Sequence, residues 1–217
     1  MIKRKNYYFN PQNYIEGIER NQNYMSKLIG VSGFARSGKD TFFERSKLLL
    51  EKYGKKAVRV AFADALKSEC DELLSKYTNL SAFTEEDTEK EIVRPLLVTY
   101  GTQIRRKLNE NCWIEKIQPQ VVEYLKSDYY VFVTDVRFKN EAQWVALNGG
   151  ILVNVSREGI KPANHEEHKQ IHLMKGLINY DVCWPTYGQD SLKSCDDHVF
   201  PLFNHLIKSE EKVEEVM

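Results

Sequence analysis

The sequence has no net charge and no long apolar segment. Its 217 residues include 31 Lys and Arg and 31 Asp and Glu, so the formal net charge is +0. This balance argues against a protein that holds a nucleic-acid polymer on a strongly basic surface, so any anion must be bound at a local site. No apolar run approaches the roughly 20 residues needed to cross a bilayer, which argues against a membrane-spanning protein.

Cysteine is also scarce. The spacing of the 4 cysteines forms no Cys-x-x-Cys pair and does not suggest a zinc site; they are Cys70, Cys112, Cys183 and Cys195. We expect reduced, partly buried thiols, which favours an intracellular location. The polar N-terminal residues 1–24 lack the apolar core of a signal peptide. The sequence therefore predicts a cytoplasmic protein.

What the chain does contain is an alternation of strand-like and helix-like patterns. We expect an N-terminal extension over residues 1–26, one domain over 27–208 and a charged tail over 209–217. Four short apolar runs are typical of buried strands, at residues 27–32, 57–63, 129–134 and 151–155. Helical periodicity follows or separates them at residues 42–53, 65–77, 94–108, 112–126 and 139–147. Such alternation predicts an α/β fold of three layers, a parallel sheet flanked by helices.

Three further stretches are patterned less clearly. Residues 81–91 are acidic and are expected to be solvated. Residues 157–190 are polar and rich in histidine, which predicts irregular structure. Residues 197–206 are expected to hold a last strand and a last helix.

A glycine-rich motif lies between the first predicted strand and the first predicted helix. Residues 33–39 read G-x-x-x-x-G-K. The glycines allow the backbone to curl so that several N–H groups point inward, and the following helix adds its positive end, which together suit a phosphate group. The lysine would reach the β- and γ-phosphates of a nucleotide such as ATP. The predicted ATP-binding residues are Gly33, Ala35, Arg36, Ser37, Gly38, Lys39, Asp40 and Thr41.

Asp40 departs from this motif, which has Ser or Thr after the lysine as a Mg²⁺ ligand. Here the hydroxyl comes one residue later, at Thr41. The Asp40 carboxylate could bind Mg²⁺ directly or through water, or it could orient an incoming nucleophile. Alternatively it only complements the dipole of the helix.

A second carboxylate follows another predicted strand. The apolar run 129–134 ends at Asp135, which is placed to hold Mg²⁺ through water, so the candidate metal ligands are Asp40, Thr41 and Asp135. Arg137 could stabilise charge on a transferring phosphoryl group. Glu141 lies four residues after Arg137, and in a helix it could pair with that arginine. The candidate catalytic residues are therefore Lys39, Asp40, Asp135 and Arg137.

Candidate acceptor-binding residues follow the second predicted strand and occupy two predicted helices. Ligands of open parallel sheets bind beyond the carboxyl ends of the strands, where residues 57–63 lead into Asp64 and Lys67. A helix cap and a solvated lysine are the alternative. Arginine suits phosphate because its planar fork binds two oxygens, and glutamine could bond a base edge. The remaining candidates are Gln103, Arg105, Arg106, Trp113 and Glu141, although Trp113 could equally be a core residue.

The stretch after the fourth predicted strand offers weaker candidates. His165, His168 and His172 have spacings that zinc sites use, but their polar surroundings favour a solvated, mobile segment instead of a metal centre. Arg157 could contact a phosphate or an adenine.

Taken together, these motifs resemble a known family. GFARSGKDT (33–41), AFADALK (61–67), RPLLVTYGTQIRR (94–106), CWIEK (112–116) and VFVTDVRFKNEA (131–142) are similar to phage-type deoxynucleoside monophosphate kinases, over roughly residues 27–157. The resemblance implies an adenylate-kinase-like P-loop NTPase fold with acceptor-binding helices and a lid near residues 157–190.

The resemblance also implies an activity. Such kinases transfer the γ-phosphoryl of ATP to a deoxynucleoside monophosphate (dNMP) with Mg²⁺, giving a dNDP and ADP for DNA precursor synthesis. The expected partners are ATP and a dNMP, with no nucleic-acid polymer and no membrane, in a monomer or homodimer, in the host cytoplasm if the protein is phage-encoded. Two alternatives stay open. One is a P-loop kinase of another phosphorylated small molecule, such as phosphomevalonate or dephospho-coenzyme A, and the other is a nucleotide-binding ATPase without transferase activity.

Overall fold

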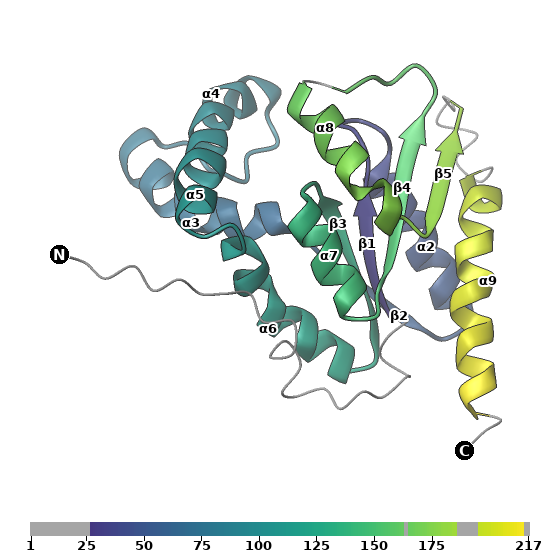
Figure 1. Ribbon diagram of the computed structural model, residues 1–217. Coiled ribbons are helices and arrows are strands. Elements are labelled where there is room, and N and C mark those ends of the chain that lie inside the picture. Colours follow the sequence, from purple (N-terminus) through teal and green to yellow (C-terminus); the bar gives the residue numbers. More distant parts are fainter. Residues whose placement is uncertain (1–26, 163–164, 186–194, 215–217) are drawn as a thin grey trace.

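The fold is built on a parallel β-sheet. The computed structural model describes residues 27–162, 165–185 and 195–214. Within them the strands are β1 (Leu28–Ser32), β2 (Lys56–Val60), β3 (Tyr129–Val136), β4 (Ile151–Arg157) and β5 (Tyr180–Trp184). Their order in the sheet is β2-β3-β1-β4-β5, and each pair of neighbours is parallel (Figure 1). The predicted α/β class and parallel sheet are confirmed.

Helices cover both faces of this sheet. Helices α2 (Lys39–Lys52) and α9 (Cys195–Glu214) pack on one face, and α6 (Cys112–Lys126) and α7 (Lys139–Leu147) pack on the other (Figure 1). Successive residues of a strand point to opposite faces. Accordingly Ile29 packs with the α2 and α9 cluster, while Leu28 packs with the α6 and α7 cluster. Both faces are covered at the central strands β1, β3 and β4, which explains why these strands read as continuous apolar runs.

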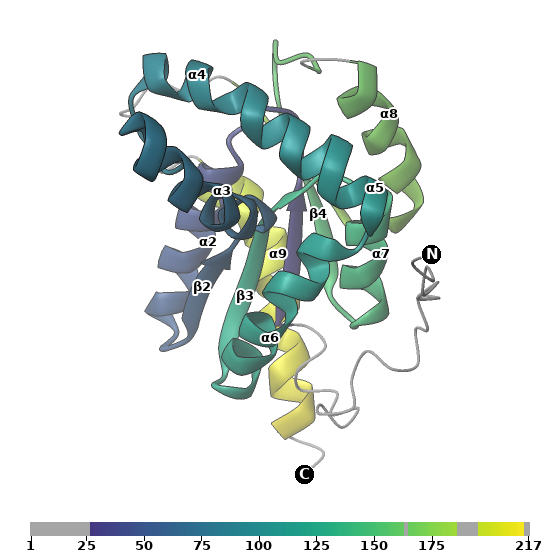
Figure 2. The same ribbon diagram turned by 90° about the vertical axis from the view of Figure 1, so that its left-hand side faces the viewer.

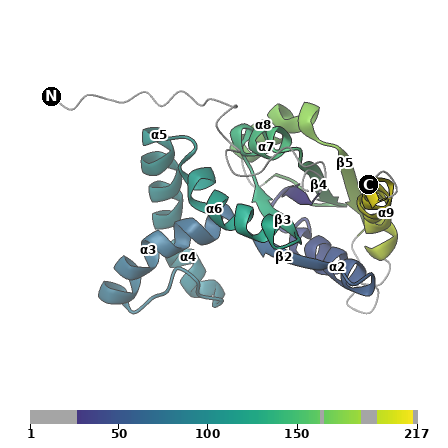
Figure 3. The ribbon, with the colours of Figure 1, turned by 90° about the horizontal axis from the view of Figure 1, so that it is seen from below.

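A helical group extends from one side of the sheet. It consists of α3 (Phe62–Thr78), α4 (Asp87–Val98), a wider π-helical turn (Thr99–Arg105) and the short α5 (Arg106–Leu108). Figure 3 shows α3, α4 and α5 standing away from the strands. Cys70, Leu74, Ala82 and Val93 form a small core of their own between these helices. The predicted helix over 94–108 is therefore the end of α4, a turn of different pitch and α5.

The boundary of the second strand differs from the prediction. We expected a strand over 57–63, but β2 ends at Val60 and α3 begins at Phe62. The backbone N–H groups of Phe62 and Ala63 donate to the Asp135 carboxylate on β3. A carboxylate at this position satisfies the free N–H groups of a helix start and favours an early helix. Asp64 consequently lies inside the first turn of α3.

The stretch 157–190 is more regular than predicted. It contains α8 (His165–Met174), a 3₁₀ turn (Lys175–Leu177) and β5. The expectation of irregular structure was wrong here because β5 has a parallel neighbour, β4, and buries Val182 and Trp184 on one face. The lid expected within residues 157–190 therefore does not include β5, because β5 belongs to the central sheet.

The end of the domain is a single helix. Instead of the strand and helix expected within 197–206, α9 runs without interruption from Cys195 to Glu214. Its buried residues recur every three or four positions, at Val199, Leu202, Phe203 and Leu206. That spacing is helical, so tertiary packing supports the helix despite Pro201.

Three expectations concern other segments. In the stretch 81–91, α4 already begins at Asp87. The extension 1–26 lies outside the described residues. In the part of the chain that the structure describes, no helix is both long and apolar enough to span a membrane.

Candidate active site at the carboxyl ends of β1 and β3

The glycine-rich motif forms a tight loop between β1 and α2. Gly33, Arg36 and Gly38 have positive φ angles of 144°, 63° and 91°. The Ser37 N–H donates to the Phe34 carbonyl at 3.2 Å, which closes the turn. A Cβ on Gly33 would lie 2.1 Å from the Val155 carbonyl oxygen of β4, so only glycine fits beside that strand. Positive φ angles of this kind turn successive backbone N–H groups inward, which is compatible with the predicted binding of a phosphate.

Lys39 at the start of α2 folds back over this loop. Its Nζ donates to the carbonyl oxygens of Gly33 at 3.0 Å and of Phe34 at 2.8 Å. Burial, followed by the positive charge of Arg137, lowers the pKa of Lys39, against the carboxylates of Asp40, Glu167 and Asp135, which raise it. An ammonium that is partly desolvated beside another cation favours an incoming anion. The electrostatics of the loop therefore suit a phosphate.

Two candidate metal ligands with side-chain oxygen atoms lie on the first turn of α2. Asp40 is exposed and Thr41 is half-buried. Asp40 is the acidic residue of that turn, where the helix dipole also favours it. Its proposed roles as a metal ligand or an orienting base remain predictions.

Asp135 has a second role that sequence reasoning missed. Its two carboxylate oxygens accept the N–H groups of Phe62 at 2.9 Å and Ala63 at 2.8 Å, so it joins β3 to the start of α3. Burial raises its pKa, against those two hydrogen bonds and the charge of Arg137. Carboxylate and hydroxyl oxygens are the ligands that Mg²⁺ prefers, so the side chains of Asp135, Asp40 and Thr41 have the chemistry that suits this ion, and their role as its ligands remains a prediction.

Glu141 does not pair with the Arg137 guanidinium as expected. It is 1% exposed and accepts the backbone N–H of Arg137 at 2.7 Å and that of Phe138 at 2.9 Å. Its ion-pair partner is Arg106, whose guanidinium also lies 4.0 Å from the Phe138 ring centroid. Glu141 therefore shapes the turn after β3, and the exposed Arg137 side chain is left to face solvent beside Lys39.

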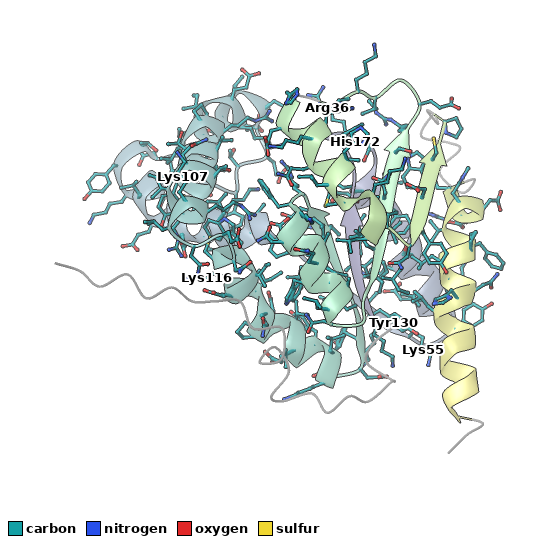
Figure 4. All side chains as sticks on the ribbon, in the orientation of Figure 1. Arg36, Lys55, Lys107, Lys116, Tyr130 and His172 are labelled. Carbon is teal, nitrogen blue, oxygen red and sulfur yellow. The ribbon has the colours of Figure 1, made fainter. Side chains whose placement is uncertain are left out.

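A second polar cluster lies between α3 and the helices that follow it. Glu69 on α3 accepts hydrogen bonds from Tyr100 at 2.9 Å and from Arg105 at 3.1 Å, and forms an ion pair with Lys116 at 2.9 Å (Lys116 is labelled in Figure 4). Burial opposes ionisation of Glu69, but the hydrogen bonds from Lys116 and Tyr100 and the charge of Arg105 outweigh it and lower its pKa. No local sequence pattern indicated a role for Glu69. It fixes Arg105, one of the predicted acceptor-binding cations.

The other predicted acceptor-binding residues are dispersed over the helical group. Asp64 pairs with Arg59 at 2.8 Å, and the Lys67 ammonium lies 5.4 Å from the Phe83 ring centroid. Gln103 is exposed on the π-helical turn.

Trp113 is a core residue, which was the alternative to stacking on a base. It is 2% exposed, packs in the α6 and α7 cluster and donates to the Gly101 carbonyl at 3.4 Å. The Arg105 guanidinium lies 5.5 Å from its ring centroid. This burial favours a packing role for Trp113 over stacking on a base.

Helix α8 lies next to the loop of residues 33–39 (the phosphate loop), within the stretch 157–190 where the resemblance implies a lid. The Glu167 carboxylate accepts the Ala35 backbone N–H at 3.0 Å, and the Gln170 side chain accepts the Lys139 N–H at 3.3 Å. Figure 2 shows α8 and α4 on either side of the end of β1, and Figure 4 shows Arg36 at the same end of the molecule as α8. A lid role for α8 remains a prediction.

The remaining candidates lie on β4 and α8. The Arg157 Nε at the end of β4 is buried and has no hydrogen-bond partner among the described residues. His168 and His172 lie on α8 with their ring centroids 4.7 Å apart, on a regular helix where a mobile segment was expected. In the described ranges, no group of three or more His, Cys, Asp or Glu residues is arranged to hold a metal ion.

Comparison with known proteins shows a similarity to a viral protein. The chain matches no protein-family model. It is 26% identical over 177 residues to a protein of Acanthamoeba polyphaga mimivirus named "Putative deoxynucleotide monophosphate kinase". The alignment covers 71% of this chain and 86% of the mimivirus protein. This similarity supports a relationship to deoxynucleotide monophosphate kinase-like proteins, on a fold consistent with that of P-loop NTPases.

Proposed function

We propose that this protein transfers the γ-phosphoryl group of ATP to a deoxynucleoside monophosphate, giving a dNDP and ADP. The observation that carries the proposal is that Lys39, at the start of α2, lies within the electrostatic influence of Asp135 and Arg137 from the end of β3. Phosphoryl transfer needs positioning and charge stabilisation more than covalent chemistry, and these three groups supply both. The name of the mimivirus protein points the same way.

In this proposal the donor lies on the phosphate loop. The N–H groups of residues 33–39 bind the phosphates, and the Lys39 ammonium leaves the Gly33 and Phe34 carbonyls to contact them. Asp40, Thr41 and Asp135 would hold Mg²⁺, which would neutralise charge on the transferring group. Arg137, whose charge acts on Lys39, stabilises the charge that spreads over the oxygens of that group.

The acceptor lies toward the helical group. Two cations bind its phosphate in this proposal: Arg105, which pairs with Glu69, and Arg106, which pairs with Glu141. Each is oriented by a carboxylate, so less conformational freedom is lost when the substrate binds. Closure of α8 over the loop would exclude water and suppress ATP hydrolysis.

The test is an assay of ADP release with ATP, Mg²⁺ and each of the four common dNMPs. We expect release that depends on a dNMP, and we expect Lys39→Ala to abolish it. Lys47→Ala is the matched control, because Lys47 lies on the same helix but pairs only loosely with Glu51 at 3.9 Å. Stimulation by phosphomevalonate or dephospho-coenzyme A instead would reassign the acceptor. ADP release that no acceptor stimulates would indicate an ATPase and refute the transferase proposal.

A further inference from the structure

Trp184 contacts the phosphate loop from the edge of the sheet, although it follows the loop by well over a hundred residues. It is the last residue of β5 and is 2% exposed. Its indole Nε1 donates to the Ser37 carbonyl oxygen at 3.0 Å, a buried hydrogen bond. Its ring also packs near Phe42 on α2, with the ring centroids 6.3 Å apart. The loop and the first turns of α2 therefore pack against this indole.

The hydrogen bond determines how one peptide group of the loop is turned. A trans peptide is planar, so its N–H points opposite to its C=O. Because the Ser37 carbonyl is held on the indole, the Gly38 N–H of the same peptide points away from Trp184. Ser37 itself is fully buried, which leaves this peptide little room to flip.

Gly38 fits the indole for a reason beyond its φ angle. A Cβ at Gly38 would lie 2.8 Å from Cζ2 of Trp184 and 3.0 Å from its Nε1. Backbone and ring are thus in direct contact, and the φ of 91° adds a second requirement for glycine. The second glycine of the motif and the tryptophan of β5 form one packed unit.

We infer that Trp184 is a positioning residue of the phosphate loop, whose indole N–H orients the Ser37–Gly38 peptide so that the Gly38 N–H is presented to a phosphate oxygen of the donor nucleotide. Trp184 acts through the loop and does not touch the nucleotide. The inference rests on the proposed function only in that the loop binds a nucleotide phosphate. Which acceptor receives the phosphoryl group does not matter to it.

The test compares Trp184→Phe with a matched control, Trp144→Phe. Phenylalanine keeps an aromatic ring but removes the indole N–H. Trp144 is also 2% exposed, but its Nε1 has no hydrogen-bond partner among the described residues. The control therefore removes a buried N–H without breaking a bond. Circular dichroism and thermal unfolding establish that each variant is folded.

We expect Trp184→Phe to weaken ATP binding about fivefold to tenfold by isothermal titration calorimetry, as for the loss of one hydrogen bond. The KM for ATP should rise by the same factor, with the KM of the acceptor unchanged. Without nucleotide, hydrogen exchange of the amides of residues 33–39 should be faster. Trp144→Phe should change none of these, whereas a merely structural role for Trp184 would lower stability and leave nucleotide affinity and loop exchange as in the wild type.

Trp184→Phe that binds ATP like the wild type, with unchanged exchange in the loop, overturns the inference. Wild-type protein that binds ATP but shows no acceptor-dependent ADP release refutes the proposed function and leaves the inference standing. Should Trp184→Phe not fold, the indole N–H resonances of ¹⁵N-labelled wild-type protein decide the question. These are assigned with Trp113→Phe and Trp144→Phe. The Trp184 resonance should be protected from exchange and should shift on addition of ATP, and its failure to shift overturns the inference.

Discussion

The contact between Glu167 and the phosphate loop leads to a prediction about ATP affinity. The Glu167 carboxylate accepts the Ala35 N–H at 3.0 Å, and its negative charge also acts on Lys39. A carboxylate oxygen in this place occupies a position that a phosphate oxygen of the nucleotide would take. ATP must then displace it. We therefore predict that Glu167→Gln binds ATP more tightly than the wild type.

The magnitude follows from the charge that the substitution removes. The glutamine side-chain oxygen still accepts the Ala35 N–H, so the hydrogen bond contributes little to the difference between the two proteins. Repulsion between the Glu167 carboxylate and a phosphate charge costs about 1 kcal/mol for unit charges about 4 Å apart in water. Removing it corresponds to about a fivefold lower Kd, since 1.4 kcal/mol is a factor of ten.

The measurement is calorimetric titration of wild-type and variant protein with ATP and Mg²⁺. Glu166→Gln is the matched control, because Glu166 is the preceding residue of α8 and bonds the Gln170 side chain at 2.8 Å instead of the loop. It should leave the Kd within about twofold of the wild type. Weaker binding by Glu167→Gln than by Glu166→Gln would refute the reasoning and would mean that the carboxylate assists the nucleotide, for example through its metal ion.

Three other predictions concern stability and reactivity. Glu141→Gln should lower the free energy of unfolding by about 2–3 kcal/mol in guanidinium titrations, because it leaves the largely buried charge of Arg106 without a carboxylate partner. A loss of less than about 0.5 kcal/mol would contradict this prediction. Because the pKa of Glu69 is lowered, its ionised form stabilises the fold at pH values above the ordinary glutamate pKa of about 4.3. The difference in unfolding free energy between the wild type and Glu69→Gln should therefore be full at pH 7 and shrink as the pH falls below about 4. A difference that stays constant from pH 7 to pH 3 would argue against the cluster around Glu69. Iodoacetamide at pH 8 should modify the exposed Cys183 first by peptide mass spectrometry, because burial both shields three other thiols and raises their pKa; these are Cys70, Cys112 and Cys195.

Local patterns were enough for the central elements. The apolar runs before Gly33 and Asp135 are strands of a parallel sheet, and Gly33 and Gly38 form the turn that their spacing indicated. These features depend on interactions between residues close in sequence, such as the positive φ angle of a glycine or the burial of a continuous apolar run. The predicted end of the second strand, at residue 63, was wrong, because the end of β2 depends on the Asp135 carboxylate from β3, far along the chain.

The roles of the charged residues also depended on distant partners. Glu141 was expected to pair with Arg137, four residues away, but Arg106 reaches it from another helix. A buried carboxylate forms its ion pair with the cation whose position allows the best hydrogen-bond geometry. Sequence spacing does not show which cation that is when the two residues lie far apart in the chain.

By itself, the sequence determined that this is an α/β protein with a glycine-rich loop ahead of a helix, because strand burial, glycine conformation and helix periodicity are local properties. Tertiary structure alone decided what surrounds that loop. It brings the Trp184 indole against Ser37 and Gly38, the Glu167 carboxylate to Ala35, and the charges of Arg137 and Asp135 to Lys39. The physical reason is that parallel strands end at the same edge of a sheet, so residues from β1, β3 and β5 meet there whatever their separation in the chain.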